Sequence, residues 1–272
     1  MKIAQISDTH FGTEIPEVVK ALEASLQIIK PDFILLSGDV TQRARKSQFI
    51  KAREFLEGTR LPFKVIPGNH DIPLFDLLTR FTNPYRLYQQ FFGARGFVYV
   101  ESHIAVIGLD ATGPERHKQG KLDPEHISAL LTSARQKVGS EGFLIVSVHQ
   151  PLLTAWTEDR PEEMIDAGLI AQIFARFHVD AVLSGHVHVP LICTSEKEYP
   201  NLPYPFIHVG AGTATSHRTR EGKPNSFDVI ELNQHEQRIQ VTQFDYQEQS
   251  KAFALKEEKV FLKSTASKWK LR

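Results

Sequence analysis

The residues best suited to chemistry follow the apolar segment 61–66, in the run Pro67-Gly68-Asn69-His70-Asp71. The apolar segment predicts a short buried strand, and the proline and glycine predict a sharp turn at its end. An amide, an imidazole and a carboxylate therefore stand just beyond a strand, where α/β sheets build their sites. These side chains suit metal binding and proton transfer. Considered alone, a turn that merely caps the strand explains the run equally well.

Four further predicted strands also end in polar residues. The apolar segments 3–7, 33–37, 143–148 and 181–184 lead respectively into Asp8-Thr9-His10, Gly38-Asp39, His149-Gln150-Pro151 and Gly185-His186-Val187-His188. Five such strand ends would converge at one edge of a sheet. Coincidence is a poor explanation for five cases, so the sequence favours a functional site over five unrelated turns.

The order D-x-H, G-D, G-N-H-D, H and G-H-x-H resembles the calcineurin-like metallophosphoesterase superfamily. The match extends from Asp8 to His188, about two-thirds of the chain, and includes every signature block. Length and the G-N-H-D block are most similar to the class III cyclic-nucleotide phosphodiesterases. Many relatives have two histidines before the proline, where this chain has His149-Gln150. The first of these positions matches the metal ligand, so the implied metal site is retained.

The resemblance implies a site for two metal ions, with Asp39 bridging them. The other implied ligands are Asp8, His10 and His188 for one metal and Asn69, His149 and His186 for the other. Nitrogen and oxygen donors without a thiolate suit Fe, Mn or Zn, and four imidazoles disfavour an all-oxygen Mg or Ca site. Two such cations would polarise the phosphate and activate a bridging hydroxide.

His70 stands beside an implied ligand without being one. The resemblance assigns it contact with the phosphate and protonation or stabilisation of the leaving oxygen, which suits a group that titrates near neutrality. Asp71 is expected to support catalysis by orienting His70 or by capping the turn. The segment 210–220 ends in Arg218 and Arg220 and is a candidate phosphate-binding loop. A glycine loop with a solvated basic end explains that segment equally well.

The resemblance thus implies a phosphodiester hydrolase, with 3′,5′-cAMP as the leading substrate. Alternatives are a glycerophosphodiesterase, a nucleotide-sugar-lipid pyrophosphatase or a broad phosphatase. A nuclease of this superfamily would be expected to carry an additional DNA-binding domain. Some superfamily members are scaffolds without catalysis, but these lose ligands or the central histidine. Every one of those residues is present here.

The elements that position these residues are predicted from apolar periodicity. Helices are predicted at 16–29, at 43–58, after Asp123-Pro124 and at about 161–177, alternating with strands. Beyond His188 the pattern predicts antiparallel strands in succession at 189–195, 205–209, 226–232 and 238–246. The expected α/β fold (α+β in some schemes) is a four-layer αββα sandwich, with two mixed β-sheets flanked by helices in one domain over residues 1–246.

Two further segments, 72–95 and 247–272, lie outside the predicted alternation of strands and helices. The aromatic-rich segment 72–95 predicts two short helices packed on the core, with a cap over the site or a homodimer interface as the alternatives. After Gln247, seven Lys or Arg stand against three Glu, which predicts a solvated or loosely docked C-terminal tail over 247–272.

Composition excludes several classes of protein. Lys plus Arg equals Asp plus Glu at 32 each, which argues against a general nucleic-acid or membrane binder. No apolar run approaches the length of a membrane span. The lone Cys193 rules out an intrachain disulfide and fits a reducing compartment, so the cytoplasm is the expected location. The expected partner is a small phosphodiester, with no membrane or nucleic acid.

Overall fold

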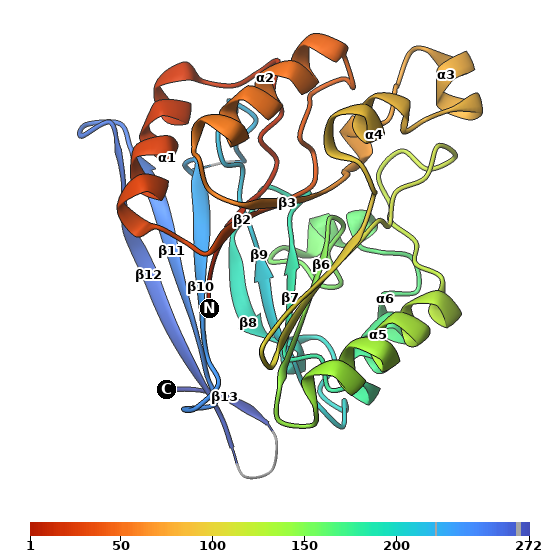
Figure 1. The fold of residues 1–272 in the computed structure, drawn as a ribbon, viewed down its shortest axis with the longest axis vertical. Coiled ribbons are helices and arrows are strands. Elements are labelled where there is room, and N and C mark those ends of the chain that lie inside the picture. The colour runs from red at the N-terminus through yellow and green to blue at the C-terminus, as the bar shows by residue number, and fades with distance from the viewer. Residues whose placement is uncertain (221, 265–267) are drawn as a thin grey trace.

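The computed structural model describes residues 1–220, 222–264 and 268–272, which form alternating strands and helices (Figure 1). The helices are α1 (Pro16–Ile29), α2 (Lys46–Gly58), α3 (Leu77–Thr82), α4 (Arg86–Phe92), α5 (Pro124–Val138) and α6 (Ala167–Arg176). The strands are β1 (Lys2–Ile6), β2 (Phe33–Ser37), β3 (Phe63–Ile66), β4 (Phe97–Glu101), β5 (Ile104–Leu109), β6 (Phe143–Val148), β7 (Ala181–Ser184), β8 (Leu191–Thr194), β9 (Ile207–Gly210), β10 (Ser226–Asn233), β11 (Arg238–Gln247), β12 (Ala252–Lys263) and β13 (Trp269–Leu271). None of these helices is long and apolar enough to cross a membrane.

The strands form two sheets that pack face to face. The first has the order β13-β12-β11-β10-β1-β2-β3 and the second β4-β5-β6-β7-β9-β8. Each sheet combines parallel and antiparallel pairs: β1 is parallel to β2 and antiparallel to β10, and β5 is parallel to β6 and antiparallel to β4. The predicted fold of two mixed sheets flanked by helices is therefore confirmed.

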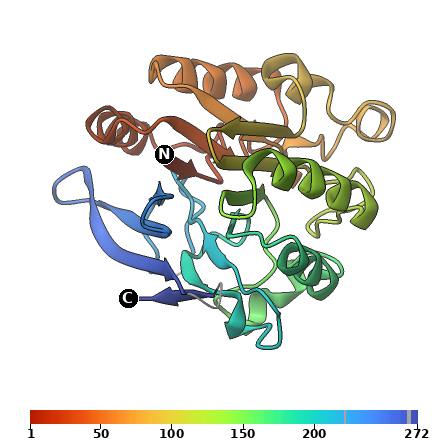
Figure 2. The same cartoon turned by 60° about the horizontal axis from the view of Figure 1, so that its bottom comes forward.

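Three apolar clusters hold the four layers together. The central cluster lies between the sheets and includes Ile3, Ile145 and Val241. One outer cluster joins α1, α2 and α4 to the first sheet, and the other joins α5 and α6 to the second. Figure 2 shows the helices outside the paired sheets. Burial on both faces explains why β2 and β6 are nearly continuous apolar runs rather than alternating ones.

Two helices are shorter than the sequence predicted. α2 begins at Lys46 rather than at residue 43, because Ala44 has a left-handed backbone with φ of 49°. α6 begins at Ala167 rather than near Pro161, because residues 157–162 form a 3₁₀ turn and Asp166 is also left-handed. The sequence prediction extended helical periodicity across these left-handed breaks.

The strands after His188 do not form one antiparallel meander. β9 pairs antiparallel with β8 but parallel with β7, within the second sheet. β10 and β11 instead belong to the first sheet, where β10 lies beside β1. The loop between β9 and β10, residues 211–225, therefore passes from one sheet to the other, and it carries Arg218 and Arg220.

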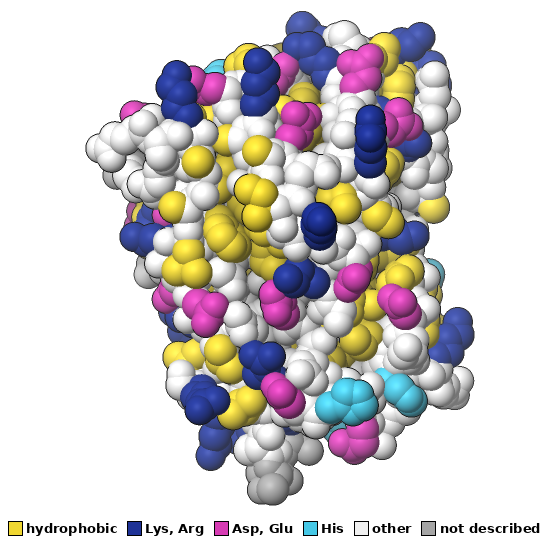
Figure 3. Space-filling model, turned by 60° about the vertical axis from the view of Figure 1, so that its left-hand side comes forward, with side chains coloured by type: hydrophobic (Ala, Val, Ile, Leu, Met, Phe, Trp, Pro, Cys, Tyr) yellow, Lys and Arg dark blue, Asp and Glu magenta, His cyan; other side chains and the backbone are white. Residues whose placement is uncertain are grey.

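The segment after Gln247 completes the first sheet instead of forming a solvated tail. β12 pairs with β11 along its length, and β13 pairs with β12. Phe261 and Trp269 are each 1% exposed, and the Trp269 ring lies 5.9 Å from that of Phe143 in the central core. Basic and acidic side chains are interspersed on the face of the molecule seen in Figure 3, in keeping with the net charge of zero. Charged residues on an edge strand masked its β pattern in the sequence.

Replacing Trp269 tests whether the last strand is part of the core. Trp269→Ala is expected to lower the free energy of unfolding by about 3–5 kcal/mol, because a large buried side chain leaves a cavity. Leu271 on the same strand is 55% exposed, so Leu271→Ala should change stability by less than about 0.5 kcal/mol. Urea denaturation measures both. Equally small effects would show that the strand does not dock in solution.

The two halves of segment 72–95 are packed differently. In α4, Tyr88 is fully buried and donates a hydrogen bond to the Val65 carbonyl at 3.0 Å. α3 instead projects at the upper right of Figure 1, and its segment exposes large apolar side chains. Those side chains are Phe75, Leu77, Leu78 and Phe81, which are 61–77% exposed. The expected packing on the core therefore holds for α4 and not for this exposed face of α3.

Candidate metal centre

The predicted ligands meet at the carboxyl ends of β1, β2 and β3 in the first sheet and of β6 and β7 in the second, and not at one edge of a single sheet as the sequence predicted. Two clusters form, and within each cluster the potential ligand atoms all lie within 4.8 Å of one another. The clusters are Asp8, His10, Asp39 and His188 in the first, and Asp39, His149 and His186 in the second. Asp39 belongs to both. Asn69 is not part of either cluster but lines the same cavity as Asp39.

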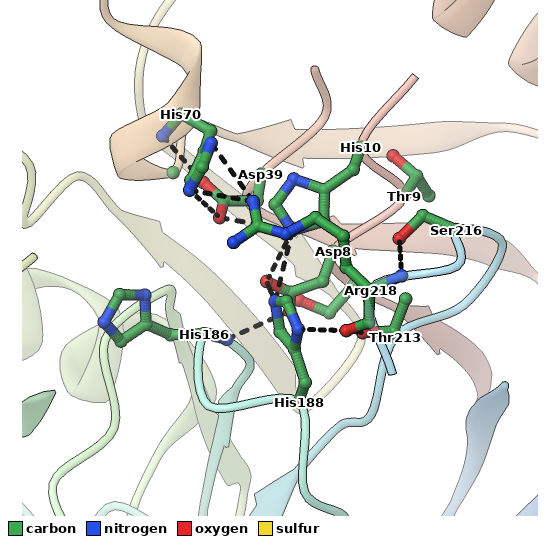
Figure 4. Close-up of polar contacts among 12 residues, drawn as sticks. Asp8, Thr9, His10, Asp39, His70, His186, His188, Thr213, Ser216 and Arg218 are labelled. Carbon is green, nitrogen blue, oxygen red and sulfur yellow. Dashed lines mark hydrogen bonds and ion pairs between the residues drawn. The ribbon is translucent and has the colours of Figure 1, made fainter. Parts of the chain in front are cut away.

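The first cluster is compact (Figure 4). His10 Nε2 lies 3.7 Å from Asp8 Oδ1 and 3.6 Å from Asp39 Oδ2. His188 Nε2 lies 3.0 Å from Asp8 Oδ1 and 3.1 Å from His10 Nε2. The Nδ1 of His188 donates to the Arg218 carbonyl at 2.6 Å. That bond places the ring proton on Nδ1 and leaves the Nε2 lone pair directed into the cluster.

The second cluster is built in the same way. His149 Nδ1 donates to the Ser37 carbonyl at 2.8 Å, which turns Nε2 toward Asp39 Oδ1 at 3.3 Å. Burial would lower the pKa of His149, but the Asp39 carboxylate outweighs it and raises that pKa to about 9. A cation at Asp39 would replace the proton that this pairing holds, because a histidine ligand must be deprotonated.

Two buried polar atoms in the site test whether its residues fit cations. Asn69 Oδ1 is buried without a hydrogen-bond partner among the described residues, and so is His186 Nε2, although a Glu162 carboxylate oxygen lies 3.3 Å from it. Such atoms are rare in folded proteins because they lose their hydration without compensation. Cations would satisfy both atoms. The residues present therefore fit a dinuclear metal centre.

The protonation states also favour cation binding. Burial would raise the pKa values of Asp8 and Asp39, but neighbouring histidines, chiefly His188 and His149 respectively, hold both below the usual range. Burial lowers the pKa of His186 to about 4 and that of His10 well below its ordinary value. Ionised carboxylates and neutral imidazoles are the forms that bind metals.

Backbone strain is concentrated at this site. Five of the cluster residues have a positive φ: Asp8 (53°), His10 (44°), Asp39 (49°), His186 (76°) and His188 (59°). Aspartate and histidine tolerate this left-handed region better than most residues, but it still costs about 1–3 kcal/mol per residue. The strain points to a functional requirement for these side-chain directions.

Glycines give the clusters room. Gly38 has φ of +97°, and a Cβ there would collide with the His149 ring. A Cβ at Gly68 would collide with the backbone nitrogen and carboxylate of Asp39. The glycines in the G-D and G-N-H-D blocks are therefore needed for close approach between strand ends.

Asp71 supports the turn and not the imidazole of His70. Its carboxylate accepts hydrogen bonds from the backbone nitrogens of Val40 (3.1 Å), Thr41 (2.8 Å) and Gly68 (2.9 Å), and from the Thr41 hydroxyl (2.8 Å). Burial and the nearby Asp39 charge raise its pKa to about 7. Of the two supporting roles expected for Asp71, these contacts fit capping, because they join the loops after β2 and β3.

His70 lies beside the clusters, held by its own set of contacts. Its Nδ1 lies 2.9 Å from the Gln42 carbonyl, which can only accept, so Nδ1 carries the proton. Its Nε2 lies 4.0 Å from Asp39 Oδ2 and 3.1 Å from Arg218 Nη1 (Figure 4). Burial lowers the pKa of His70 below its ordinary value. Nε2 therefore carries the lone pair, which can accept from Arg218 and lies next to the shared carboxylate.

The two arginines of the 211–225 loop are placed differently. Arg218 reaches into the site, where Nη1 also donates to the Gln42 side chain at 3.1 Å. Arg220 lines the same cavity, but its Nη2 donates to Asp159 at 2.8 Å and its guanidinium lies over the Trp156 ring. His208 and His217 lie apart from the cavity: His208 is buried near Ser184 in the second sheet, and His217 is exposed.

The clusters open into a cavity of about 420 Å³. Its lining residues are Asp39, Arg43, Asn69, His70, Leu74, His117, Lys118, Glu162, His186, Val187, His188, Arg218, Thr219 and Arg220. Sequence reasoning missed Arg43, which it placed in a helix, and His117, which it did not single out as a site residue. A larger cavity of about 640 Å³ lies between β4 and α5 but is lined by none of the cluster residues.

The fold and the paired clusters are compatible with a dinuclear metal centre at a shared carboxylate. The model of the calcineurin-like phosphoesterase family matches residues 1–190, and the chain belongs to this family. It is therefore a phosphoesterase, as the order of its motifs predicted.

Relatives agree with this assignment. A probable cyclic nucleotide phosphodiesterase of a Synechococcus species is 27% identical over 71% of this chain and 75% of its own length. A probable glycerophosphodiester phosphodiesterase of Arcobacter nitrofigilis is 25% identical over 69% and 72%. A dimetal phosphatase from Danio rerio has the same fold, with a TM-score of 0.63 at 11% identity over 89% of this chain and 95% of that one.

Proposed function

We propose that this chain hydrolyses phosphodiesters at the two clusters, with a 3′,5′-cyclic nucleotide such as cAMP as the leading substrate. The observation that carries the proposal is the cavity in which both clusters meet the cationic side chains of Arg43 and Arg218. Its volume of about 420 Å³ lies within the range of small-molecule sites. The name of the Synechococcus relative supports the choice of a cyclic nucleotide.

The clusters are proposed to hold two cations, with Asp39 as the shared ligand. Asp8, His10 and His188 would bind one, and Asn69, His149 and His186 the other. Bound cations of Fe, Mn or Zn, which suit these nitrogen and oxygen donors, would supply Lewis acidity and lower the pKa of the attacking water. Asp71 is proposed to keep the loops after β2 and β3 in register, so that Asp39 and Asn69 face each other.

Three side chains of the chain itself are proposed to act on the substrate. Arg218 and Arg43 flank His70, with Nη1 atoms 3.1 Å from Nε2 and Nδ1 respectively, so they place positive charge where a phosphate would lie. The Gln42 carbonyl holds the proton on His70 Nδ1 and leaves Nε2 to face the leaving oxygen. We assign the stabilisation or protonation of that oxygen to the imidazolium form of His70, in which Nε2 also carries a proton that it can donate.

Comparing the two arginines of one loop tests phosphate binding. Arg218→Ala should raise KM about ten- to a hundredfold through the loss of a charge-assisted hydrogen bond. Metal content should be unchanged, since the Arg218 carbonyl that holds His188 remains. Arg220→Ala should have the smaller effect, because its guanidinium already pairs with Asp159. Steady-state kinetics with metal analysis measures this, and equal effects of the two variants would contradict the assignment.

Glycerophosphodiesters are the second candidate substrate, because the Arcobacter relative is nearly as similar as the Synechococcus one. Purified protein loaded with Mn or Fe should hydrolyse a chromogenic diester and lose that activity when a chelator removes the metals. Parallel assays with cAMP, glycerophosphodiesters and phosphomonoesters rank the substrates. Absence of diester hydrolysis by metal-loaded protein would refute the proposed function.

A further inference from the structure

Phe75 presents an exposed aromatic ring next to Leu74, a residue that lines the cavity. Phe75 is 77% exposed, whereas most phenylalanines are buried. The guanidinium carbon of Arg43 lies over this ring, 5.9 Å from its centroid, and Arg43 Nη1 lies 3.1 Å from His70 Nδ1. The preceding residue, Leu74, lines the cavity itself. The Arg43 guanidinium therefore contacts both the Phe75 ring and His70, the residue proposed to face the leaving oxygen.

Buried contacts hold the segment around Phe75 in place. Arg80 is only 7% exposed, and its guanidinium donates to the Pro73 carbonyl at 2.9 Å and to the Arg116 carbonyl at 3.0 Å. Asp76 accepts a hydrogen bond from the Thr79 backbone nitrogen at 3.0 Å. These bonds anchor the chain on both sides of Phe75, so the exposed ring is a built feature of the cavity rim.

Other apolar groups near the site are less available. Trp156 is half-buried and has two cationic groups over its ring, Arg220 at 5.4 Å and Lys223 at 6.0 Å, whereas Phe75 is exposed and has only that of Arg43 among the described residues. Phe81 is 64% exposed but, unlike Phe75, has no cation–π contact with Arg43 in the described structure. Phe75 is therefore the ring best placed to receive a flat group attached to a phosphate bound at the clusters.

We propose that Phe75 is a specificity residue, on which the base of a nucleoside phosphodiester stacks while the phosphate lies at the clusters. This inference rests on the proposed diester hydrolysis and extends it to the recognition of the nucleoside. Every nucleobase presents a π face, so stacking favours nucleoside esters over glycerol esters without selecting one base. Arg43, which contacts both Phe75 and His70, would lie between base and phosphate.

Two chromogenic diesters separate the contribution of the base to kcat/KM from that of the phosphate. Thymidine 5′-(p-nitrophenyl) phosphate and methyl p-nitrophenyl phosphate release the same p-nitrophenol and differ only in carrying a nucleoside or a methyl group. Phe75→Ala should lower kcat/KM on the thymidine ester about 5- to 150-fold, the range of one base–aromatic stack, and leave the methyl ester unchanged. Phe75→Trp should retain the preference, whereas Phe75→Leu should lose it, since a leucine side chain cannot stack.

Phe81→Ala is the matched control, because it removes an equally exposed ring from the same segment; neither ester should be affected. Equal losses on both esters for Phe75→Ala would show that Phe75 acts only by positioning Arg43, and would overturn the proposal. Unchanged kinetics on both esters would also overturn it. So would a change in oligomeric state on gel filtration in both variants, because a second copy of the chain would then cover α3. Failure of the wild-type protein to hydrolyse either ester would instead refute diester hydrolysis, and this inference with it.

Discussion

Asp39→Ala is expected to lose bound metal and activity together. Asp39 is the one residue common to both clusters, with Oδ2 3.6 Å from His10 Nε2 and Oδ1 3.3 Å from His149 Nε2. Without this carboxylate, two cations would have no shared anion to offset their repulsion. Activity on a chromogenic diester should fall to background, and metal analysis of the purified variant should show less metal per chain than in the wild type.

A buried aspartate outside the site controls for damage to the fold. Asp180 is fully buried at the opposite end of β7, where it accepts hydrogen bonds from the Leu144 backbone nitrogen at 2.8 Å and the Tyr204 hydroxyl at 2.9 Å. Asp180→Ala should lower thermal stability but leave the metal content of the folded protein intact. Asp39→Ala that retained its full metal content would show that Asp39 is not the bridging ligand.

His70→Ala is expected to keep its metals and turn over slowly. His70 belongs to neither cluster: its ring lies within hydrogen-bond distance of Gln42, Arg43 and Arg218, and its Nε2 is 4.0 Å from Asp39 Oδ2. General acid catalysis typically contributes about 10²–10⁴-fold, which sets the expected loss in kcat. Metal analysis and steady-state kinetics on the same preparation separate the two effects. Loss of metal in this variant, as in Asp39→Ala, would make His70 a ligand and refute the division of roles.

The loss in His70→Ala should depend on the leaving group. p-Nitrophenolate leaves without help, so methyl p-nitrophenyl phosphate should be affected least. The 3′-oxygen of a ribose is a poor leaving group, so 3′,5′-cAMP should be affected most. Because the variant enzyme is the same in both assays, altered folding or metal content cannot produce the difference. Equal losses on the two substrates would assign His70 to phosphate binding instead.

The sequence by itself determined the family and predicted the residues that gather in the two clusters, because these depend on local features. Each cluster residue follows a short apolar strand within a few residues, and neighbouring parallel strands bring their carboxyl ends together. Periodicity likewise placed α1 and the start of α5, where Asp123 caps the helix as its residue type predicts.

Only the tertiary structure decided which charged groups reach the cavity. Arg218 and Arg220 are two residues apart and chemically identical, yet one points at His70 and the other at Asp159. Arg43 was predicted to lie in a helix and instead contacts His70, because the left-handed residue Ala44 delays the helix start. Such contacts join residues far apart in the sequence and leave no periodic trace in it.

The C-terminal strands show the same limit for the fold. β12 and β13 lie at a sheet edge, where one side faces solvent, so a charged composition is compatible with pairing. Both strands are held in place because Phe261 and Trp269 are buried in the central core. That core lies between two sheets that only the folded chain brings together. Local sequence records the strand ends that carry the metal site, whereas long-range packing determines what surrounds it.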